Sequence, residues 1–527
     1  MQIASIKAYQ VLDSRGEPTI RVRMESATGA HARFDAPGSI SVADGEAKER
    51  RDHDLAFDGN AVTGNIDAIL NIIAPKFIGY PLGHQADFDA LITALDGTAD
   101  KSNLGTNTLT ALSGAYYLLS CYEQKKEVWQ SVSELIKTKP TMPRLFANLV
   151  SGGAHALGLD IQEIMIVPKT TDVMAATQMI YSVNHTARAI FQNLYGPSAL
   201  LVADEGSMAP IGTSAETVME AFEQLAGKYQ QGYELAIDMA GYNLFQNGAY
   251  VMSGQSQTMQ QLGDLYAQWD KKYPLLSIED PFAEQDLEGL KYLTAKPGRK
   301  CMIVGDGTTA TDAARITSLA QQKLLSAVVI KPSQVGTMTE MFNAIRASQS
   351  AGLKLIIAHR SGDTNDTFLS DLAYGAGAFG LKLGAPVRGE RVAKYNRLLE
   401  IATDLGLSKL DASSMQIHPA AINSTPQLLV NQVSQPSAPT PATVQQTPNP
   451  TPNRTTPSVS FNTPPPSGSG NRPVSPVYTA PAASQPTDGK PVSPVFSPTA
   501  PAATPVDSSA EAKPTIYSPI QDTTPRV

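Results

Sequence analysis

The stretch SAVVIKPSQVG, from Ser326 to Gly336, decides the fold because its short apolar run ends on the charged residue Lys331. Five other apolar runs end on a polar group in the same way. They are ELAID, PLLSIE, CMIVGD, KLIIAH and AFGLK, which end at Asp238, Glu279, Asp306, His359 and Lys382. A lysine that closes a strand often only lays its stem over apolar surface, but six endings of one kind predict a shared site.

The spacing of these endings predicts a β/α barrel of the parallel, TIM-like type. Successive endings lie between 23 and 41 residues apart, and most of these gaps suit one strand and one returning helix. Active sites of such barrels lie at the C-terminal ends of the strands. We therefore expect the six side chains to meet in one pocket, with Lys331 as the candidate catalytic base.

The composition divides the 527-residue chain near residue 411. Of the 38 prolines, 24 lie beyond this point, and the charges there balance, so the net charge of −8 belongs to the front part. The absence of a basic run argues against nucleic acid or an anionic membrane as the main partner. The two cysteines match no metal or redox spacing, and no apolar run suits a signal peptide or a membrane span. These features predict a cytoplasmic protein.

Three parts are expected along the chain. They are an α+β capping domain over residues 1–138, a barrel over 139–410, and a disordered tail rich in Pro, Ser and Thr over 411–527. In the first part, alternating apolar residues predict two or three antiparallel strands within residues 2–24 and 29–35. Helical spacing follows over residues 54–77, 87–95 and 108–134.

Two segments outside these elements have alternative interpretations. Ala36 to Asp52 is rich in small and hydroxyl residues, which suits either a plain surface loop or a mobile lid. The tail repeats PVSPV at Pro473 and Pro491, a pattern that suits an extended tether or a peptide ligand for a protein partner. A passive tail is the alternative.

The carboxylates divide into two groups. Glu163 follows LDIQ and Glu205 follows ALLVAD, and either could cap a helix or form a surface ion pair. The apolar run before Glu205 favours burial, and hence a raised pKa that suits a general acid. Asp238, Glu279 and Asp306 come from three strand ends and together predict a hard oxygen site for Mg²⁺, unless each merely caps the following helix.

Ten motifs occur in order over residues 1 to about 405. They are DSRGEPT at Asp13, LDGTADKS at Leu95, SGGAHA at Ser151, DIQEIMI at Asp160, DEGSMAP at Asp204, SIEDP at Ser277, VGD at Val304, IKPSQVGT at Ile330, AHRSGDTND at Ala358 and RVAKYNRLL at Arg391. With these motifs the chain resembles enolase, the hydratase of glycolysis.

The resemblance implies a role for individual residues. Those that match the first Mg²⁺ site are Asp238, Glu279 and Asp306, and Ser41 matches the lid serine that helps to bind a second Mg²⁺. Lys331 matches the base, and Glu205 matches the acid, supported by Glu163. The residues that match the substrate-binding groups are His155, Gln162, His359, Arg360, Ser361 and Lys382.

The sequence also departs from the family pattern. The lid reads GSISV from Gly38 to Val42 where the family has SGAST, so Ile40 and Val42 replace smaller or hydroxyl residues. Gly307 follows Asp306 where the family has a second Asp, and the segment after His155 is shortened. Ser333 stands where Asn is common. The arginine of the usual dimer ion pair is Tyr9 here, and the proline-rich tail has no counterpart in the family.

The resemblance implies dehydration of 2-phosphoglycerate to phosphoenolpyruvate, two Mg²⁺ ions per site and a homodimer. It also leaves room for a secreted or cell-surface pool. One alternative is an enolase-like scaffold with an impaired lid that presents its tail to partner proteins. Another is a related enzyme that acts on a different carboxylate, which the phosphate-binding set His359, Arg360 and Ser361 disfavours.

Overall fold

The computed structural model describes residues 1–40 and 42–407. Ser41, the predicted tail over 411–527 and its boundary with the barrel at residue 410 lie outside the described residues. Within them, no helix is both long enough and apolar enough to cross a membrane.

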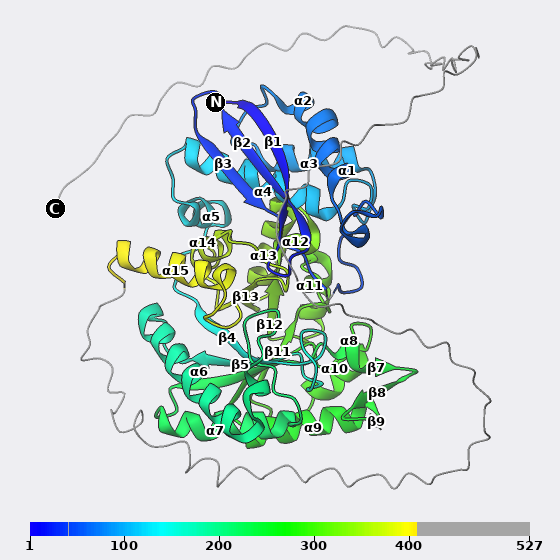
Figure 1. The fold of residues 1–527 in the computed structure, drawn as a ribbon, viewed down its shortest axis with the longest axis vertical. Coiled ribbons are helices and arrows are strands. Elements are labelled where there is room, and N and C mark those ends of the chain that lie inside the picture. Colours follow the sequence, from blue (N-terminus) through cyan, green and yellow to red (C-terminus); the bar gives the residue numbers. More distant parts are fainter. Residues whose placement is uncertain (41, 408–527) are drawn as a thin grey trace, which may run out of the picture. The chain divides into compact units, whose positions relative to one another are not determined.

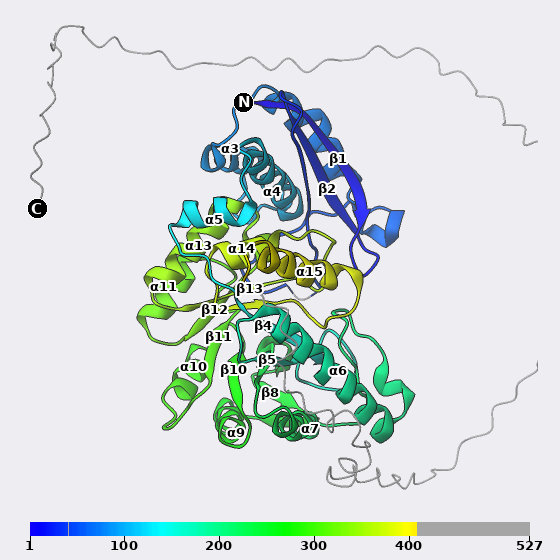
Figure 2. The ribbon, with the colours of Figure 1, turned by 90° about the vertical axis from the view of Figure 1, so that its left-hand side faces the viewer.

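The N-terminal part is a three-stranded antiparallel sheet covered by helices (Figure 1). The strands are β1 (Ile3–Leu12), β2 (Pro18–Ser26) and β3 (His31–Asp35). The helices are α1 (Thr63–Ala68), a π-helical turn (Ile69–Ile73), α2 (Ala74–Phe77), α3 (Gln85–Asp96), α4 (Thr106–Glu123) and α5 (Val128–Ile136), preceded by a 3₁₀ turn (Ala56–Gly59). α4 is buried from its first residue, Thr106, to Cys121, and it lies against β2 and β3 (Figure 2).

Two helix predictions in this part need correction. The first helical stretch begins at Thr63 and not at residue 54, because Phe57 and Asp58 have positive φ and interrupt the helical path. The stretch predicted over 108–134 is two helices, since Lys125, between α4 and α5, has φ 55°. A left-handed residue cannot continue a right-handed helix.

The second part is a closed eight-stranded barrel. Its strands are β4 (Arg144–Ser151), β5 (Glu163–Pro168), β6 (Tyr233–Asp238), β10 (Leu275–Glu279), β11 (Met302–Gly305), β12 (Ala327–Ile330), β13 (Lys354–Ala358) and β14 (Gly380–Lys382). The helices associated with the barrel are α6 (Val173–Tyr195), α7 (Ala215–Lys228), α9 (Met259–Lys272), α10 (Leu287–Thr294), α11 (Ala313–Gln321), α13 (Met338–Ser350), α14 (Phe368–Gly375) and α15 (Gly389–Asp404).

Short elements fill the connections of the barrel. A 3₁₀ turn (Pro197–Leu200) follows α6, and the short helices are α8 (Gly241–Leu244) and α12 (Pro332–Val335). A small antiparallel sheet after β6 contains β7 (Phe245–Gln246), β8 (Ala249–Met252) and β9 (Gln255–Gln257).

The barrel differs from the predicted all-parallel arrangement in one strand. β5 pairs antiparallel with both β4 and β6, whereas the other neighbouring strands pair parallel. Glu163 is therefore the first residue of its strand, not the last. Its register partners are Ser151 and Asp238, each the final residue of its own strand, so Glu163 still lies at the rim where the parallel strands end.

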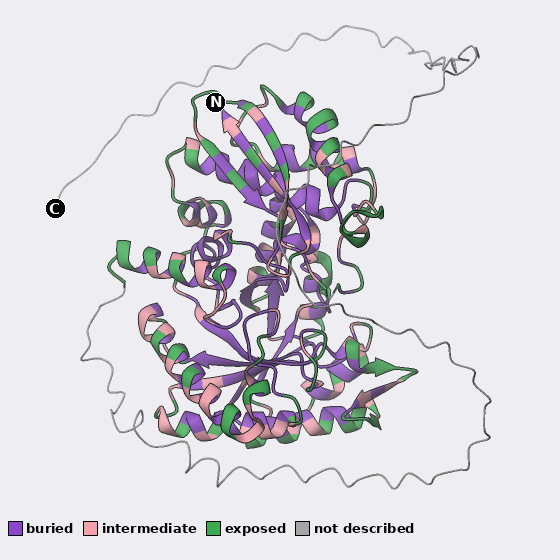
Figure 3. Cartoon of the chain, in the orientation of Figure 1, coloured by how far each residue is buried: buried purple, intermediate pink, exposed green. Residues whose placement is uncertain are grey.

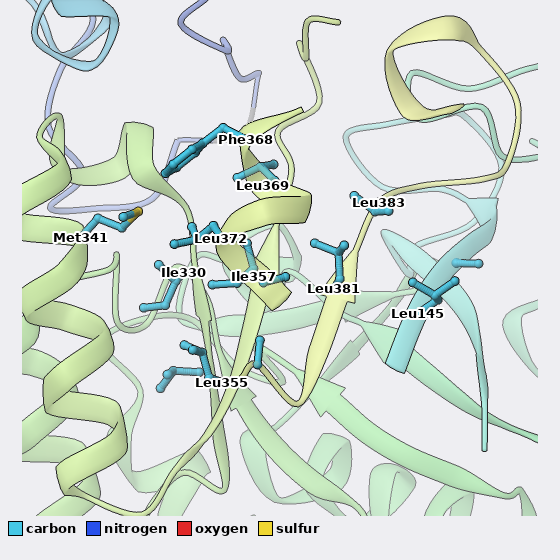
Figure 4. Packing of buried hydrophobic residues seen from close by; sticks show 14 of the residues in the cluster. Leu145, Ile330, Met341, Leu355, Ile357, Phe368, Leu369, Leu372, Leu381 and Leu383 are labelled. Carbon is cyan, nitrogen blue, oxygen red and sulfur yellow. The ribbon is translucent and has the colours of Figure 1, made fainter. Parts of the chain in front are cut away.

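The core separates the barrel interior from the helical shell. The strands are buried throughout most of the barrel (Figure 3). Side chains on alternate strand positions, such as Val328 and Ile330, pack outward in the cluster that includes the helices, and Ala327 and Val329 pack with the interior cluster. Figure 4 shows this outward layer, where Ile330 and Ile357 lie near Leu372 and Phe368.

The capping part contacts the barrel rim through the turn between β1 and β2. The Asp13 carboxylate accepts hydrogen bonds from the backbone N–H groups of Arg15 and Glu17, at 2.8 and 3.0 Å. Ser14 donates its backbone N–H to Asp363 and its hydroxyl to the carbonyl of Ser361. This turn, which lies within the DSRGEPT motif, thus supports the barrel loop that carries Arg360 and Ser361.

Candidate active site

Strand alternation carries the predicted polar residues into the barrel mouth. Lys331 lies two positions after Val329, whose side chain belongs to the interior cluster, and Asp238 lies two positions after the interior residue Ala236. Since successive strand side chains alternate in direction, both polar groups continue the inward row. All six predicted endings lie at the final residue of a strand or directly after it. They are Asp238, Glu279, Asp306, Lys331, His359 and Lys382.

Lys382 forms ion pairs with three of the carboxylates. Its Nζ lies 2.9 Å from Asp238 Oδ2, 2.9 Å from Glu279 Oε1 and 3.0 Å from Glu163 Oε2. The side chain is only 2% exposed. Burial lowers the pKa of Lys382, but the three carboxylates outweigh burial and hold it well above its usual range. Lys382 therefore carries a positive charge at neutral pH, among these three carboxylates.

Lys331 lies on the other side of the acidic row. Its ammonium forms an ion pair with Asp306, which also accepts a hydrogen bond from Gln334 Nε2 at 3.0 Å. Burial tends to lower the pKa of Lys331, and the charge of Asp306 raises it above the usual value. In return, Lys331 outweighs the effect of burial on Asp306, whose pKa is lowered. In the free site Lys331 is thus protonated.

A buried group of imidazoles and carboxylates forms the second side of the site. His155 Nδ1 lies 3.7 Å from Glu205 Oε1 and 3.9 Å from Glu163 Oε1. His359 Nε2 lies 3.4 Å from Glu205 Oε1, and Asn148 donates to Glu205 Oε2 at 3.0 Å. Glu205 does not follow a strand of the barrel. The apolar run before it forms a 3₁₀ turn and an irregular segment, but the loop still brings the carboxylate to the pocket.

The pKa of Glu205 is lowered and not raised as expected, whereas that of Glu163 is raised. Burial and the charge of Glu205 raise the pKa of Glu163 well above its usual range. Burial alone would also raise that of Glu205, but His359 and His155 outweigh burial and hold it low. Burial lowers the pKa of His359 to about 4, although the charge of Glu205 acts in the opposite direction.

The remaining predicted substrate groups also lie at this rim. Gln162 Nε2 is 3.3 Å from Asp238 Oδ2, and Arg360 is buried against Glu46, with its Nη1 2.8 Å from Glu46 Oε2. The Ser361 hydroxyl accepts the backbone N–H of Ile40 at 3.2 Å. Residues 36–40 and 42–52 contain no helix.

The donor set fits a divalent cation. Asp238, Glu279 and Asp306 are carboxylates at adjacent strand ends, and oxygen donors of this kind suit Mg²⁺. Burial and the charge of Asp238 raise the pKa of Glu279 well above its usual range, although Lys382 is close. The buried negative charge thus exceeds what the lysines compensate, and a bound cation would balance it.

Several residues of the site were missed in the sequence analysis. Asn148 contacts Glu205, and the fully buried Arg391 contacts His359 Nδ1 and donates to the carbonyls of Arg360 and Ser361, both at 2.7 Å. Glu46 pairs with Arg360. Only Arg391 had a signal in the sequence, since it lies in one of the ten motifs; Asn148 lies inside an apolar strand run and Glu46 in a loop rich in charge.

Comparison with known proteins agrees with this geometry. The family model described as the enolase C-terminal TIM barrel domain matches residues 139–417, and the enolase N-terminal domain matches residues 3–132. An enolase of Aeropyrum pernix is 39% identical over 417 residues, which cover 77% of this chain and 95% of that protein. Enolases of Methanocaldococcus jannaschii and Pyrococcus furiosus are each 34% identical, over 77% of this chain and 96% and 95% of theirs. The chain therefore belongs to the enolase family.

Proposed function

We propose that this chain catalyses the reversible dehydration of 2-phosphoglycerate to phosphoenolpyruvate and water. The observation that carries the proposal is the division of the pocket into two sides. One side has the buried Lys382 and the partly buried Lys331 among three carboxylates, and the other has Glu163 and Glu205 facing two imidazoles. A base and an acid on separate sides suit a reaction that removes a proton from one carbon and a hydroxyl group from the next.

Lys331 and Glu205 divide the proton transfers. Lys331 Nζ takes the C2 proton, and the electron pair of the broken C–H bond passes into an ene-diolate. The charge of Asp306 raises the pKa of Lys331 in the free site, and this effect is reduced when the carboxylate ligates a cation. Glu205 then protonates the departing hydroxyl group, so the C3–O bond breaks and water leaves. Glu163, with its raised pKa, is the store of the proton that Glu205 delivers.

The other proposed residues hold substrate and metal. Asp238, Glu279 and Asp306 would hold one Mg²⁺, and Ser41 would contribute to a second. Bound Mg²⁺ would supply positive charge that stabilises the doubly charged carboxylate of the intermediate. Lys382 adds a fixed positive charge on the same side. The residues proposed to bind the substrate phosphate and carboxylate are His155, Gln162, His359, Arg360 and Ser361.

Assembly and location are further parts of the proposal. We infer a homodimer in the cytoplasm, and a protein partner for the tail over 411–527. The family supports the first two, and the two cysteines, Cys121 and Cys301, are buried free thiols, as suits a reducing compartment.

The test is the absorbance of phosphoenolpyruvate formed from 2-phosphoglycerate by the full chain, with Mg²⁺ and with a chelator in its place. We expect product only with Mg²⁺. A well-folded chain that forms none would refute the proposal and favour the enolase-like scaffold.

A further inference from the structure

Glu46 is a buried carboxylate at the base of the predicted lid segment. Its side chain is only 5% exposed, yet it belongs to an irregular loop and not to the barrel. A buried carboxylate needs compensation from positive charge or hydrogen bonds, and Glu46 has both kinds. Oε2 accepts from Arg360 Nη1 at 2.8 Å, and Oε1 accepts from Gln334 Nε2 at 3.2 Å and from the backbone N–H of Ala43 at 3.0 Å.

The ion pair with Arg360 involves only one end of the guanidinium group. Among the residues that the structure describes, Glu46 is the only acid in an ion pair with Arg360, and it contacts Nη1 alone. Burial lowers the pKa of Arg360, and the charge of Glu46 outweighs this and raises it. A guanidinium carries five N–H donors in a rigid fork. Because Glu46 contacts Nη1 alone, it holds one end of the fork, and the Nε and Nη2 donors remain available to an anion.

A second set of hydrogen bonds links Glu46 to Asp306 through Gln334. Thr311 Oγ1 accepts the backbone N–H of Lys331 at 3.0 Å, so its own hydrogen is free to be donated to Gln334 Oε1. This contact defines which end of the Gln334 amide is the carbonyl. The two hydrogens of Nε2 then go to two carboxylates, Glu46 at 3.2 Å and Asp306 at 3.0 Å.

We propose that Glu46 is a positioning residue, which holds Arg360 with its free edge toward the substrate phosphate and links the lid base to the acidic row. The inference rests on the proposed function, because it takes Arg360 as the phosphate-binding group. Glu46 itself does not touch the substrate and acts only through Arg360. The loop that carries Ser41 and the arginine that receives the phosphate are thus connected through one carboxylate, 314 positions away from Arg360 in the chain.

The test compares Glu46→Gln with a matched control, Glu49→Gln, in the full chain with Mg²⁺. Glu49 lies on the same loop and pairs with Arg51, so its variant removes an equal charge from a partly exposed ion pair. For Glu46→Gln we expect KM for 2-phosphoglycerate to rise by about 10- to 10²-fold with a smaller change in kcat, as for loss of binding shared by ground and transition states. The inhibition constant of inorganic phosphate should rise in parallel. Glu49 makes no ion pair with Arg360, although its charge also raises the pKa of that residue, so Glu49→Gln should change both values far less.

A double variant separates positioning from general damage. If Glu46 acts through Arg360, Glu46→Gln should add little to the defect of Arg360→Lys, because changes along one chain of contacts are not additive. A wild-type KM in folded Glu46→Gln, or fully additive defects, would overturn the proposal. If Glu46→Gln does not fold, Glu46→Asp, which keeps the charge but shortens the side chain, answers the same question by its KM. Failure of the proposed function would appear differently, as a wild-type chain that forms no product.

Discussion

Replacing Gly114 by alanine tests how closely α4 approaches the antiparallel sheet. A Cβ atom at this position would lie 2.4 Å from Cγ and Cδ2 of Phe34, which is shorter than any real carbon contact. The Phe34 ring is 3% exposed and meets the Phe368 ring edge-on, with centroids 5.7 Å apart. The ring therefore has little room to withdraw, and the helix has to move instead.

Two opposing effects set the magnitude. Alanine normally stabilises a helix interior by about 1 kcal/mol relative to glycine, and overpacking a filled core costs about 1–3 kcal/mol. We expect Gly114→Ala to lower the free energy of unfolding by up to about 2 kcal/mol. Gly227, near the end of α7, provides the control, because the nearest atom to its added Cβ is Gln231 Nε2 at 4.0 Å. Gly227→Ala should keep the stabilisation that alanine gives to a helix relative to glycine.

The assay is thermal unfolding followed by far-ultraviolet circular dichroism, with the three proteins at one scan rate because large enzymes often unfold irreversibly. The expected order of midpoints is Gly114→Ala below wild type and Gly227→Ala at or above it. A Gly114→Ala midpoint equal to that of Gly227→Ala would show that α4 does not lie this close to β3.

Three other predictions concern the base, a buried carboxyl group and the tail. Lys331→Ala should abolish exchange of the substrate C2 hydrogen with deuterium in solvent, followed by NMR, whereas Glu205→Gln should keep the exchange and lose dehydration by roughly 10²–10⁴-fold; exchange in Lys331→Ala would exclude Lys331 as the base. Burial raises the pKa of Asp366 from 3.8 to about 7, so the folded state holds this proton over a range in which the unfolded chain has lost it, and stability falls as pH rises from about 4 to 7. Asp366→Asn should remove this decline. At pH 8 its free energy of unfolding, measured by urea denaturation, should exceed that of wild type by about 2 kcal/mol once partial solvent exposure is considered. At pH 4 the two should not differ in this way, and an equal difference at both pH values would contradict the raised pKa. A chain that ends at Ser408 should keep its kcat for 2-phosphoglycerate, because the proline-rich tail has too few large apolar residues to pack on the barrel; loss of activity would show that it does.

The residues predicted best are those that terminate apolar runs. Lys331 and Asp238 could be placed at the barrel mouth because a short run of β-forming residues and a strict two-residue alternation are both local properties. The overall division into a sheet with helices and a barrel follows from the same patterns. The enolase motifs then gave each polar ending a role that spacing alone does not supply.

Strand direction was the part that local pattern could not supply. Alternation is the same for a strand read in either direction, so nothing within EIMIVP shows that Glu163 begins β5. The one available signal is the connection from Ser151 to Glu163, whose 11 residues are fewer than a parallel crossover requires.

Partners distant in sequence account for the other differences. The lowered pKa of Glu205 depends on His155 and His359, which lie on separate loops. Glu46 and Arg360 meet only because the capping part lies against the barrel rim. Charge in a loop usually indicates a solvated surface, so composition alone could not identify Glu46 as buried.

The reversed strand β5 also bears on how such a site can change over time. Because β4 and β5 form a hairpin, the loop that carries His155 starts and ends at the rim and includes no helix of the outer shell. A change in the length of this loop can therefore alter the entrance of the site without a shift of β4 or β5. The shortened segment after His155 is a change of this kind. It can modify substrate access while the lysines and carboxylates at the strand ends keep their positions.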